Sequence, residues 1–151
     1  MPDIAANSSA HEREGREFEK GGHICLAGAG VTNNWSLIEP LKRTNQVTVV
    51  ERFRMLFANS ILATANVLVL DCSEEPERGV GAVRGLRRLY PDVAIVLVNG
   101  ALSPAEIAAA FREGVKDYFS QQSNAALVVE RVQYLCRQSR RGSAAQNAYG
   151  A

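Results

Sequence analysis

Five short apolar runs alternate with segments of helical periodicity along most of the chain. The runs are HICLA (23–27), QVTVVE (46–51), NVLVLD (66–71), AIVLVN (94–99) and DYF (117–119). Strands that are apolar on both faces are typical of a parallel sheet with helices on either side. The pattern therefore predicts an α/β fold with five parallel strands.

The segments between the apolar runs predict helices of unequal regularity. Ser103, a following proline and Glu106 have the spacing of a capping box, which begins the fourth helix. We expect this helix to end at Gly114. Pro40 falls inside the first helical segment (33–43), where it removes a backbone donor, so that helix should start late or bend.

Composition divides the chain into three parts. Residues 1–22 are polar, charged and without apolar periodicity, and we expect a disordered tail. Residues 23–138 contain the alternating pattern and predict a single domain, because 151 residues that are 46% hydrophobic suffice for one core. Residues 139–151 are small and polar, which favours a linker leading to an output domain absent from this chain.

Charge and cysteine usage exclude several classes of function. The net charge of +1 argues against direct binding of nucleic acid by this chain. No apolar stretch approaches the roughly 20 residues of a membrane span, so we expect a cytoplasmic protein with no membrane contact. Cys25, Cys72 and Cys136 are widely spaced and odd in number, which predicts reduced thiols and no metal site. We expect no cofactor.

Asp71 ends the third apolar run, and Gly79 follows eight residues later. Farther along the chain are RRLYPDVAIVLV (87–98) and AFREGVKDYF (110–119). Together these pieces resemble the receiver domain of bacterial response regulators over roughly residues 22–138. The resemblance implies a CheY-like, flavodoxin-like fold: a doubly wound five-stranded parallel sheet of order 2-1-3-4-5 with helices on both faces.

The resemblance also implies a phosphorylation site whose other members are missing here. In the family, two acids after strand one hold magnesium, a hydroxyl follows strand four, and a lysine follows strand five. The corresponding positions hold Ala27, Gly28, Ala29, Asn99 and Gln121, with Gln122 next. Only Asp71 and the switch aromatic, Tyr118, match. Because phosphoryl transfer depends on metal and cationic clamping, we interpret Asp71 as a vestigial phosphoacceptor that caps a turn with Ser73.

Two alternatives remain open at this stage. One is a phosphorylatable receiver in which Asp71 still accepts a phosphoryl group. The other is a small Rossmann-like nucleotide-binding domain, because Gly28-x-Gly30 follows a strand and Glu51 ends the next strand about twenty residues on. Asn33 at the third glycine position argues against the second alternative.

No nucleophile or acid–base constellation can be assembled, so we do not expect an enzyme. The resemblance implies that the fourth helix, fifth strand and fifth helix form a face where partners dock. The candidate residues on it are Glu106, Glu113, Lys116, Asp117, Arg131 and Gln133. We expect a phosphorylation-independent receiver that binds a protein partner or forms a homodimer, and that controls a transcription-regulatory output.

Single residues carry three more expectations. His23 should lie at the surface beside the tail, and Cys72 is a candidate exposed thiol next to Asp71. Basic residues at positions 84, 87 and 88 lie along one helix and predict a solvated face.

Overall fold

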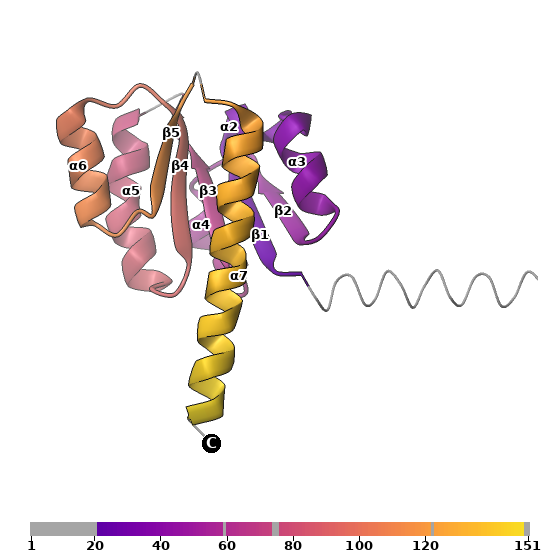
Figure 1. The fold of residues 1–151 in the computed structure, drawn as a ribbon. Coiled ribbons are helices and arrows are strands. Elements are labelled where there is room, and N and C mark those ends of the chain that lie inside the picture. Colours follow the sequence, from indigo (N-terminus) through magenta and orange to yellow (C-terminus); the bar gives the residue numbers. More distant parts are fainter. Residues whose placement is uncertain (1–20, 59, 74–75, 122, 150–151) are drawn as a thin grey trace, which may run out of the picture.

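A parallel five-stranded sheet forms the centre of the molecule (Figure 1). The computed structural model describes residues 21–58, 60–73, 76–121 and 123–149. The strands are β1 (His23–Ala27), β2 (Gln46–Val50), β3 (Val67–Asp71), β4 (Ala94–Gly100) and β5 (Asp117–Ser120). They lie in the order β2-β1-β3-β4-β5, and every neighbouring pair is parallel. The predicted flavodoxin-like topology is confirmed.

The burial of the strands follows their place in the sheet. Every residue of β1 is buried, as are the first four of β3, because helices cover both faces of these central strands. The edge strand β2 is largely exposed or half-buried. The apolar runs of the sequence therefore place all five strands to within one residue at each end.

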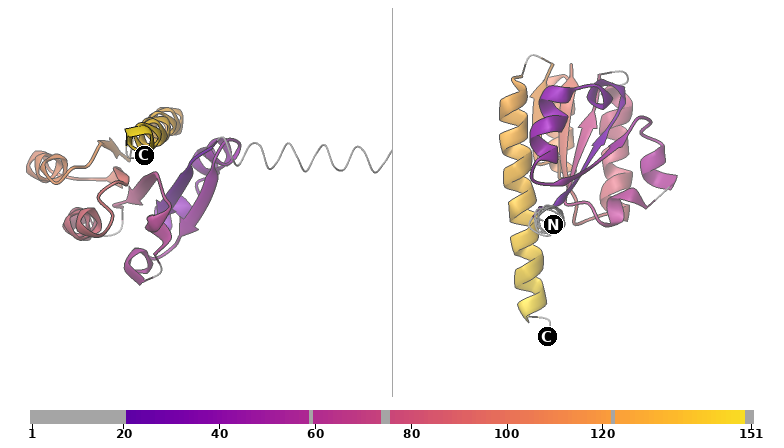
Figure 2. Two further views of the ribbon diagram at one scale, coloured as in Figure 1. Left: turned by 90° about the horizontal axis from the view of Figure 1, so that it is seen from below. Right: turned by 90° about the vertical axis from the view of Figure 1, so that its right-hand side faces the viewer.

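Helices cover both faces of the sheet (Figure 2). They are α2 (Ala29–Thr32), α3 (Trp35–Lys42), α4 (Met55–Ala58), α5 (Pro76–Leu89), α6 (Pro104–Arg112) and α7 (Ala125–Tyr149), with a 3₁₀ turn at Ile61–Ala63. One apolar core joins α2, α3 and α7 to the sheet, and a second joins α4, α5 and α6 to its other face. The layers are those of a doubly wound α/β fold.

The capping signals in the sequence act as predicted on α6. The Ser103 hydroxyl accepts from the Glu106 N–H, and the Glu106 carboxylate accepts from the Ser103 N–H. The helix ends before Gly114, whose φ of 101° lies in the left-handed region that glycine adopts readily. The cap and the glycine together fix where the loops before and after α6 begin.

The helix expected over residues 33–43 starts late, as predicted, at Trp35, but Pro40 does not interrupt it. Asn33 and Asn34 separate the single turn α2 from α3, and Pro40 lies inside α3. Leu37 and Leu41 point into the core from α3. The segment after β1 is therefore a short turn followed by a late helix.

Helix α7 extends farther than expected. It has 25 residues and continues to Tyr149, so most of the predicted linker (139–151) is helical (Figure 1). Alanine, glutamine and arginine are good helix formers, so a small and polar composition does not end a helix that is already nucleated. None of the described helices, α7 included, is long and apolar enough to cross a membrane. The predicted tail lies almost wholly outside the described residues.

Candidate functional site

Three central strands end together at one edge of the sheet, and the candidate site lies there. Ala27 at the end of β1 pairs with Leu70, and Asp71 at the end of β3 pairs with Val98 of β4. Gly28 follows β1 directly and donates its N–H to Val50 O at 2.9 Å. This carboxyl edge is where a doubly wound sheet places its ligand crevice.

Asp71 is half-buried, and its two carboxylate oxygens have different surroundings. Oδ1 accepts a hydrogen bond of 2.8 Å from the backbone N–H of Ser73, the turn-capping contact expected from the sequence. Oδ2 is buried and has no hydrogen-bond partner among the described residues. The carboxylate is thus fixed on one side and unsatisfied on the other.

Glycines line the unsatisfied side of Asp71. A Cβ on Gly28 would lie 2.7 Å from Asp71 Cβ, and φ of Gly28 is 114°. A Cβ on Gly30 would overlap Asp71 Oδ2 and lie 2.9 Å from its Cγ. Both positions therefore require glycine because the β1–α2 turn packs directly on the Asp71 side chain.

The residues around Asp71 do not fit magnesium. The residues expected at the acidic positions are Ala27, Gly28 and Ala29, whose side chains provide no oxygen ligand. The described part of the chain contains no group of three histidine, cysteine or acidic side chains that could hold a metal. Because magnesium is bound through carboxylates in near-octahedral geometry, a single free oxygen of Asp71 does not make its site.

Asn99, the residue expected at the hydroxyl position, adopts an unusual backbone conformation. Its φ is 60°, a left-handed value that asparagine tolerates better than β-branched residues. It lies in an irregularity between β4 and β5, where Val98 pairs with Phe119 and Gly100 pairs with Ser120. Its side chain lines a cavity of about 40 Å³ rather than forming a hydrogen bond to Asp71 within the described structure.

The lysine position of the family carries no cation here. Gln121 is exposed at the end of the β5 segment, and Gln122 lies outside the described residues. No described lysine or arginine forms an ion pair with Asp71. Within the described ranges, no ion pair therefore places a positive charge on this carboxylate to stabilise an attached phosphoryl group.

Tyr118 is held inward under the loop that follows β4. Its hydroxyl donates to Gly100 O at 2.7 Å and accepts from the Leu102 N–H at 3.3 Å. The ring packs with the core residues on the α4, α5 and α6 side of the sheet. Two hydrogen bonds and ring packing therefore fix this loop to β5.

The glycine loop is a poor match to a dinucleotide site. Exposed Glu51 follows β2 beside Gly28, as that hypothesis requires. However, α2 has only four residues, and the Asp71 carboxylate lies against Gly30. An anionic group already in contact with the loop repels a pyrophosphate, so the geometry explains these glycines through Asp71 instead.

The candidate interaction residues separate into distinct groups. Asp117 and Arg131 form an ion pair of 3.1 Å, and exposed Lys116 precedes Asp117 in the chain. Glu113 turns toward α5 and pairs with Arg84 at 2.6 Å. The two remaining positions have other roles: Glu106 caps α6, and Gln133 lines a cavity with Gly21, Gly22 and Asn45 on another side of α7.

Two expectations about single residues are wrong. His23 is buried, with its Nε2 2.7 Å from Thr48 Oγ1, and burial lowers its pKa. Cys72 is also buried, and burial first, with the Asp71 charge second, raises its pKa to about 12. On α5, Arg84 and Arg88 are exposed as expected, whereas Arg87 is half-buried and donates to the Pro91 and Val93 carbonyls.

No protein-family model matches the sequence, and a search of curated proteins finds no match. Solved structures do match. A response regulator from Thermotoga maritima has a TM-score of 0.66 and 15% identity, covering 78% of this chain and 98% of its own. The chain has the fold of a receiver domain.

Two other solved structures with this fold belong to proteins of different kinds. One is a response regulator protein from Burkholderia pseudomallei with a phosphorylated aspartic acid, calcium ion and citrate (TM-score 0.62, 16% identity, covering 83% of this chain and 75% of its own). Another is a putative pilus assembly-related protein from Burkholderia pseudomallei K96243 (TM-score 0.61, 18% identity, covering 80% and 93%). At these identities the similarity establishes the receiver fold alone. The chemistry of the site has to be argued from the residues of this chain.

Proposed function

We propose that this chain is an atypical receiver domain that signals through protein contacts and does not require phosphorylation of Asp71. The observation that supports this most is the Asp71 site itself. It combines a receiver fold with glycines, an asparagine and a glutamine where metal and phosphoryl ligands would be needed. The proposal includes a cytoplasmic location and a transcription-regulatory output, as in the response regulators it resembles.

The fixed position of Tyr118 also supports independence from phosphorylation. A switch that relays phosphorylation needs a hydroxyl after β4 and an aromatic side chain that is free to move. Here Asn99 has no hydroxyl, and Tyr118 is tied to Gly100 and Leu102 without any modification of Asp71. These two hydrogen bonds therefore hold Tyr118 inward without a phosphoryl group on Asp71.

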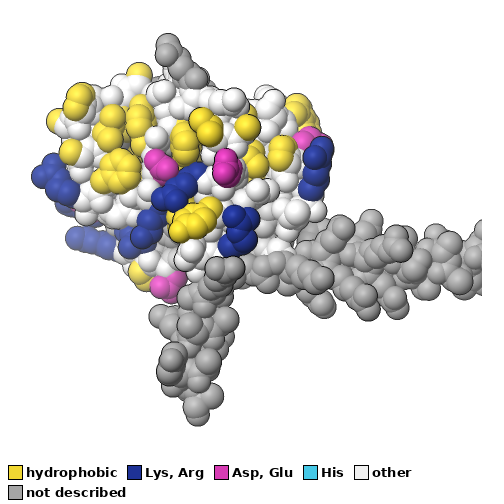
Figure 3. All heavy atoms as spheres, viewed as in Figure 1, with side chains coloured by type: hydrophobic (Ala, Val, Ile, Leu, Met, Phe, Trp, Pro, Cys, Tyr) yellow, Lys and Arg dark blue, Asp and Glu magenta, His cyan; other side chains and the backbone are white. Residues whose placement is uncertain are grey.

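That face, formed by α6, β5 and α7, supports a role in self-association. Figure 3 shows hydrophobic side chains gathered on it, with basic side chains below them. Phe111 of α6 is 45% exposed and Leu127 of α7 is 56% exposed. Exposed apolar residues bordered by charges are suited to pairing across a two-fold axis.

Intact-protein mass spectrometry after incubation with acetyl phosphate and magnesium tests the loss of phosphorylation. The chain is compared with an Asp71→Asn variant, and an active receiver serves as the positive control. We expect no phosphoryl adduct on the chain while the control is labelled. An adduct that disappears in the variant would restore Asp71 as a phosphoacceptor and refute the proposal.

Light scattering tests self-association through the α6–β5–α7 face. Leu127→Glu places a charge on the face, and Leu89→Glu is the matched control, because Leu89 on α5 is 58% exposed and lies outside the face. We expect the parent and the control to be dimers and Leu127→Glu to be a monomer. Equal masses for both variants would refute this interface.

A further inference from the structure

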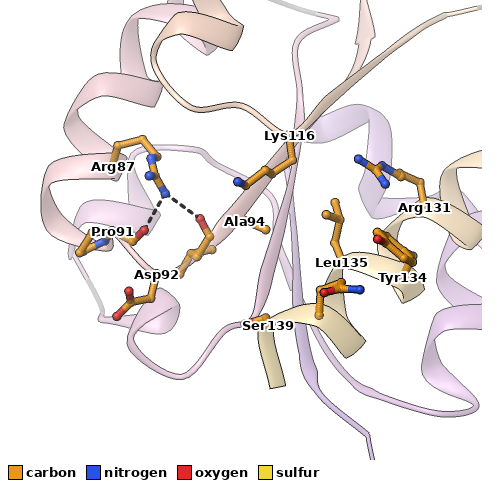
Figure 4. Close-up of a pocket in the computed structure, with 11 residues that line it drawn as sticks. Arg87, Pro91, Asp92, Ala94, Lys116, Arg131, Tyr134, Leu135 and Ser139 are labelled. Carbon is orange, nitrogen blue, oxygen red and sulfur yellow. Dashed lines mark hydrogen bonds between the residues drawn. The ribbon is translucent and has the colours of Figure 1, made fainter. Parts of the chain in front are cut away.

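A basic groove lies at the opposite end of β4 and β5 from Asp71. It runs between the C-terminal end of α5 and the middle of α7 and has a volume of about 550 Å³ (Figure 4). Its lining includes the apolar residues Val93, Ala94 and Leu135 and the basic residues Arg87, Lys116 and Arg131. The groove thus combines apolar and positively charged side chains.

Two of the three cations are held in place by the protein. Arg87 donates through Nη1 to Pro91 O at 2.7 Å and to Val93 O at 3.3 Å. Arg131 donates through Nε to Asp117 and lies over the Tyr134 ring, 5.2 Å from its centroid. Fixing these guanidinium groups lowers the entropy lost when they bind an anion.

The third cation, Lys116, has no ion-pair partner in the part of the chain that the structure describes. Lys116 extends across the space between Arg87 on one side and Arg131 on the other (Figure 4), and no described acidic side chain forms an ion pair with it. Asp92 lies at the rim, where its carboxylate points away from the groove in Figure 4. Asp117 offsets part of the Arg131 charge, whereas Arg87 and Lys116 have no acidic partner among the described residues, so the groove keeps an excess of positive charge.

We propose that this groove binds an acidic segment of a partner protein, with carboxylates on Lys116 and Arg131 and an apolar side chain on Tyr134. This proposal rests on the proposed interaction function and names the chemistry of the partner. Charge complementarity favours an acidic occupant. The apolar residues between the cations and the 43% exposed Tyr134 ring favour an extended chain that alternates acidic and apolar side chains.

Fluorescence anisotropy with the full chain and a labelled peptide tests the groove. The probe is a peptide of about twelve residues that alternates glutamate with leucine, and glutamine replaces glutamate in the control peptide. Lys116→Glu reverses the unpaired charge, whereas Lys42→Glu reverses an exposed lysine on α3, away from the groove. We expect Lys116→Glu to weaken binding at least about tenfold and Lys42→Glu by less than about twofold.

A third variant separates the groove from a general charge effect. Tyr134→Ala changes no charge and removes the aromatic wall, and we expect binding to weaken by about threefold or more. Circular dichroism verifies that each variant is folded.

Equal binding by Lys116→Glu and Lys42→Glu, or equal binding of the glutamine peptide, would overturn the proposal. Displacement of the peptide by ADP at micromolar concentration would assign the groove to nucleotides instead. These results are independent of the mass spectrometry and light scattering above. A negative result for peptide binding would therefore refute the groove proposal without refuting the proposed function, and the two failures can be told apart.

Discussion

Replacing Gly30 with alanine tests whether the glycine loop is shaped by Asp71. The new Cβ would overlap Asp71 Oδ2 and lie 2.9 Å from Asp71 Cγ and 3.1 Å from Ser73 Oγ. Overpacking of this kind costs about 1–3 kcal/mol. The gain from placing alanine in the single turn α2 is at most about 1 kcal/mol. We therefore expect Gly30→Ala to lower the free energy of unfolding by about 1–2 kcal/mol.

A double-mutant cycle isolates the contact with Asp71. In an Asp71→Ala background the carboxylate is gone, so Gly30→Ala should become neutral or stabilising. We expect a coupling free energy of about 2 kcal/mol, within the range for residues in direct contact. Urea unfolding followed by circular dichroism measures all four proteins, with unchanged m-values as the check on two-state behaviour.

Gly81 provides the matched control for this experiment. It lies in α5, is exposed, and a Cβ placed on it would meet nothing within 4 Å. Gly81→Ala should therefore stabilise the protein by about 0.5–1 kcal/mol through helix propensity alone. If Gly30→Ala stabilises equally, or costs the same with and without Asp71, the steric explanation of the loop is wrong.

Three shorter predictions concern other parts of the fold. Tyr118→Phe removes the hydrogen bond to Gly100 O and should lower the free energy of unfolding by about 1 kcal/mol; no change in urea midpoint would contradict the tie. The pKa of His23 is lowered by burial, so its contribution to stability is complete above the unfolded pKa of 6.5 and is lost as the pH falls below it; urea midpoints between about pH 8 and 5 should fall less in His23→Gln. Burial raises the pKa values of Cys25 and Cys72 to about 12, so both thiols should react with a disulfide reagent at pH 8 only after urea is added, and rapid labelling of the native protein would contradict this.

The sequence predicts the sheet well because strand burial is a local property. Runs such as VLVLD are apolar at successive positions, which only a strand covered on both faces requires. The capping box at Ser103 is likewise local, since its two hydrogen bonds join residues three apart. The ends of helices and strands that are set by residues close together in the chain can therefore be predicted from the sequence.

The surroundings of a side chain depend on residues far away in the sequence. The predictions that proved wrong concern such surroundings. His23 is buried by Thr48 and Thr64, which belong to distant segments, and no feature of its own neighbourhood indicates this. Gln133 and Arg131 are two residues apart on α7 yet lie on different sides of it, because a helix turns about 200° over that interval. The candidate site residues could be identified from the sequence, whereas their contacts required the fold.

The length of α7 has a mechanical consequence. At about 1.5 Å per residue, its 25 residues form a rod of roughly 37 Å, and residues between Val128 and Cys136 pack in the core beside the sheet. A tilt of about 5° around its first turn would displace the backbone at Tyr149 by roughly 3 Å. A rigid helix of this length would therefore convert a small rotation beside β5 into a larger displacement at its far end.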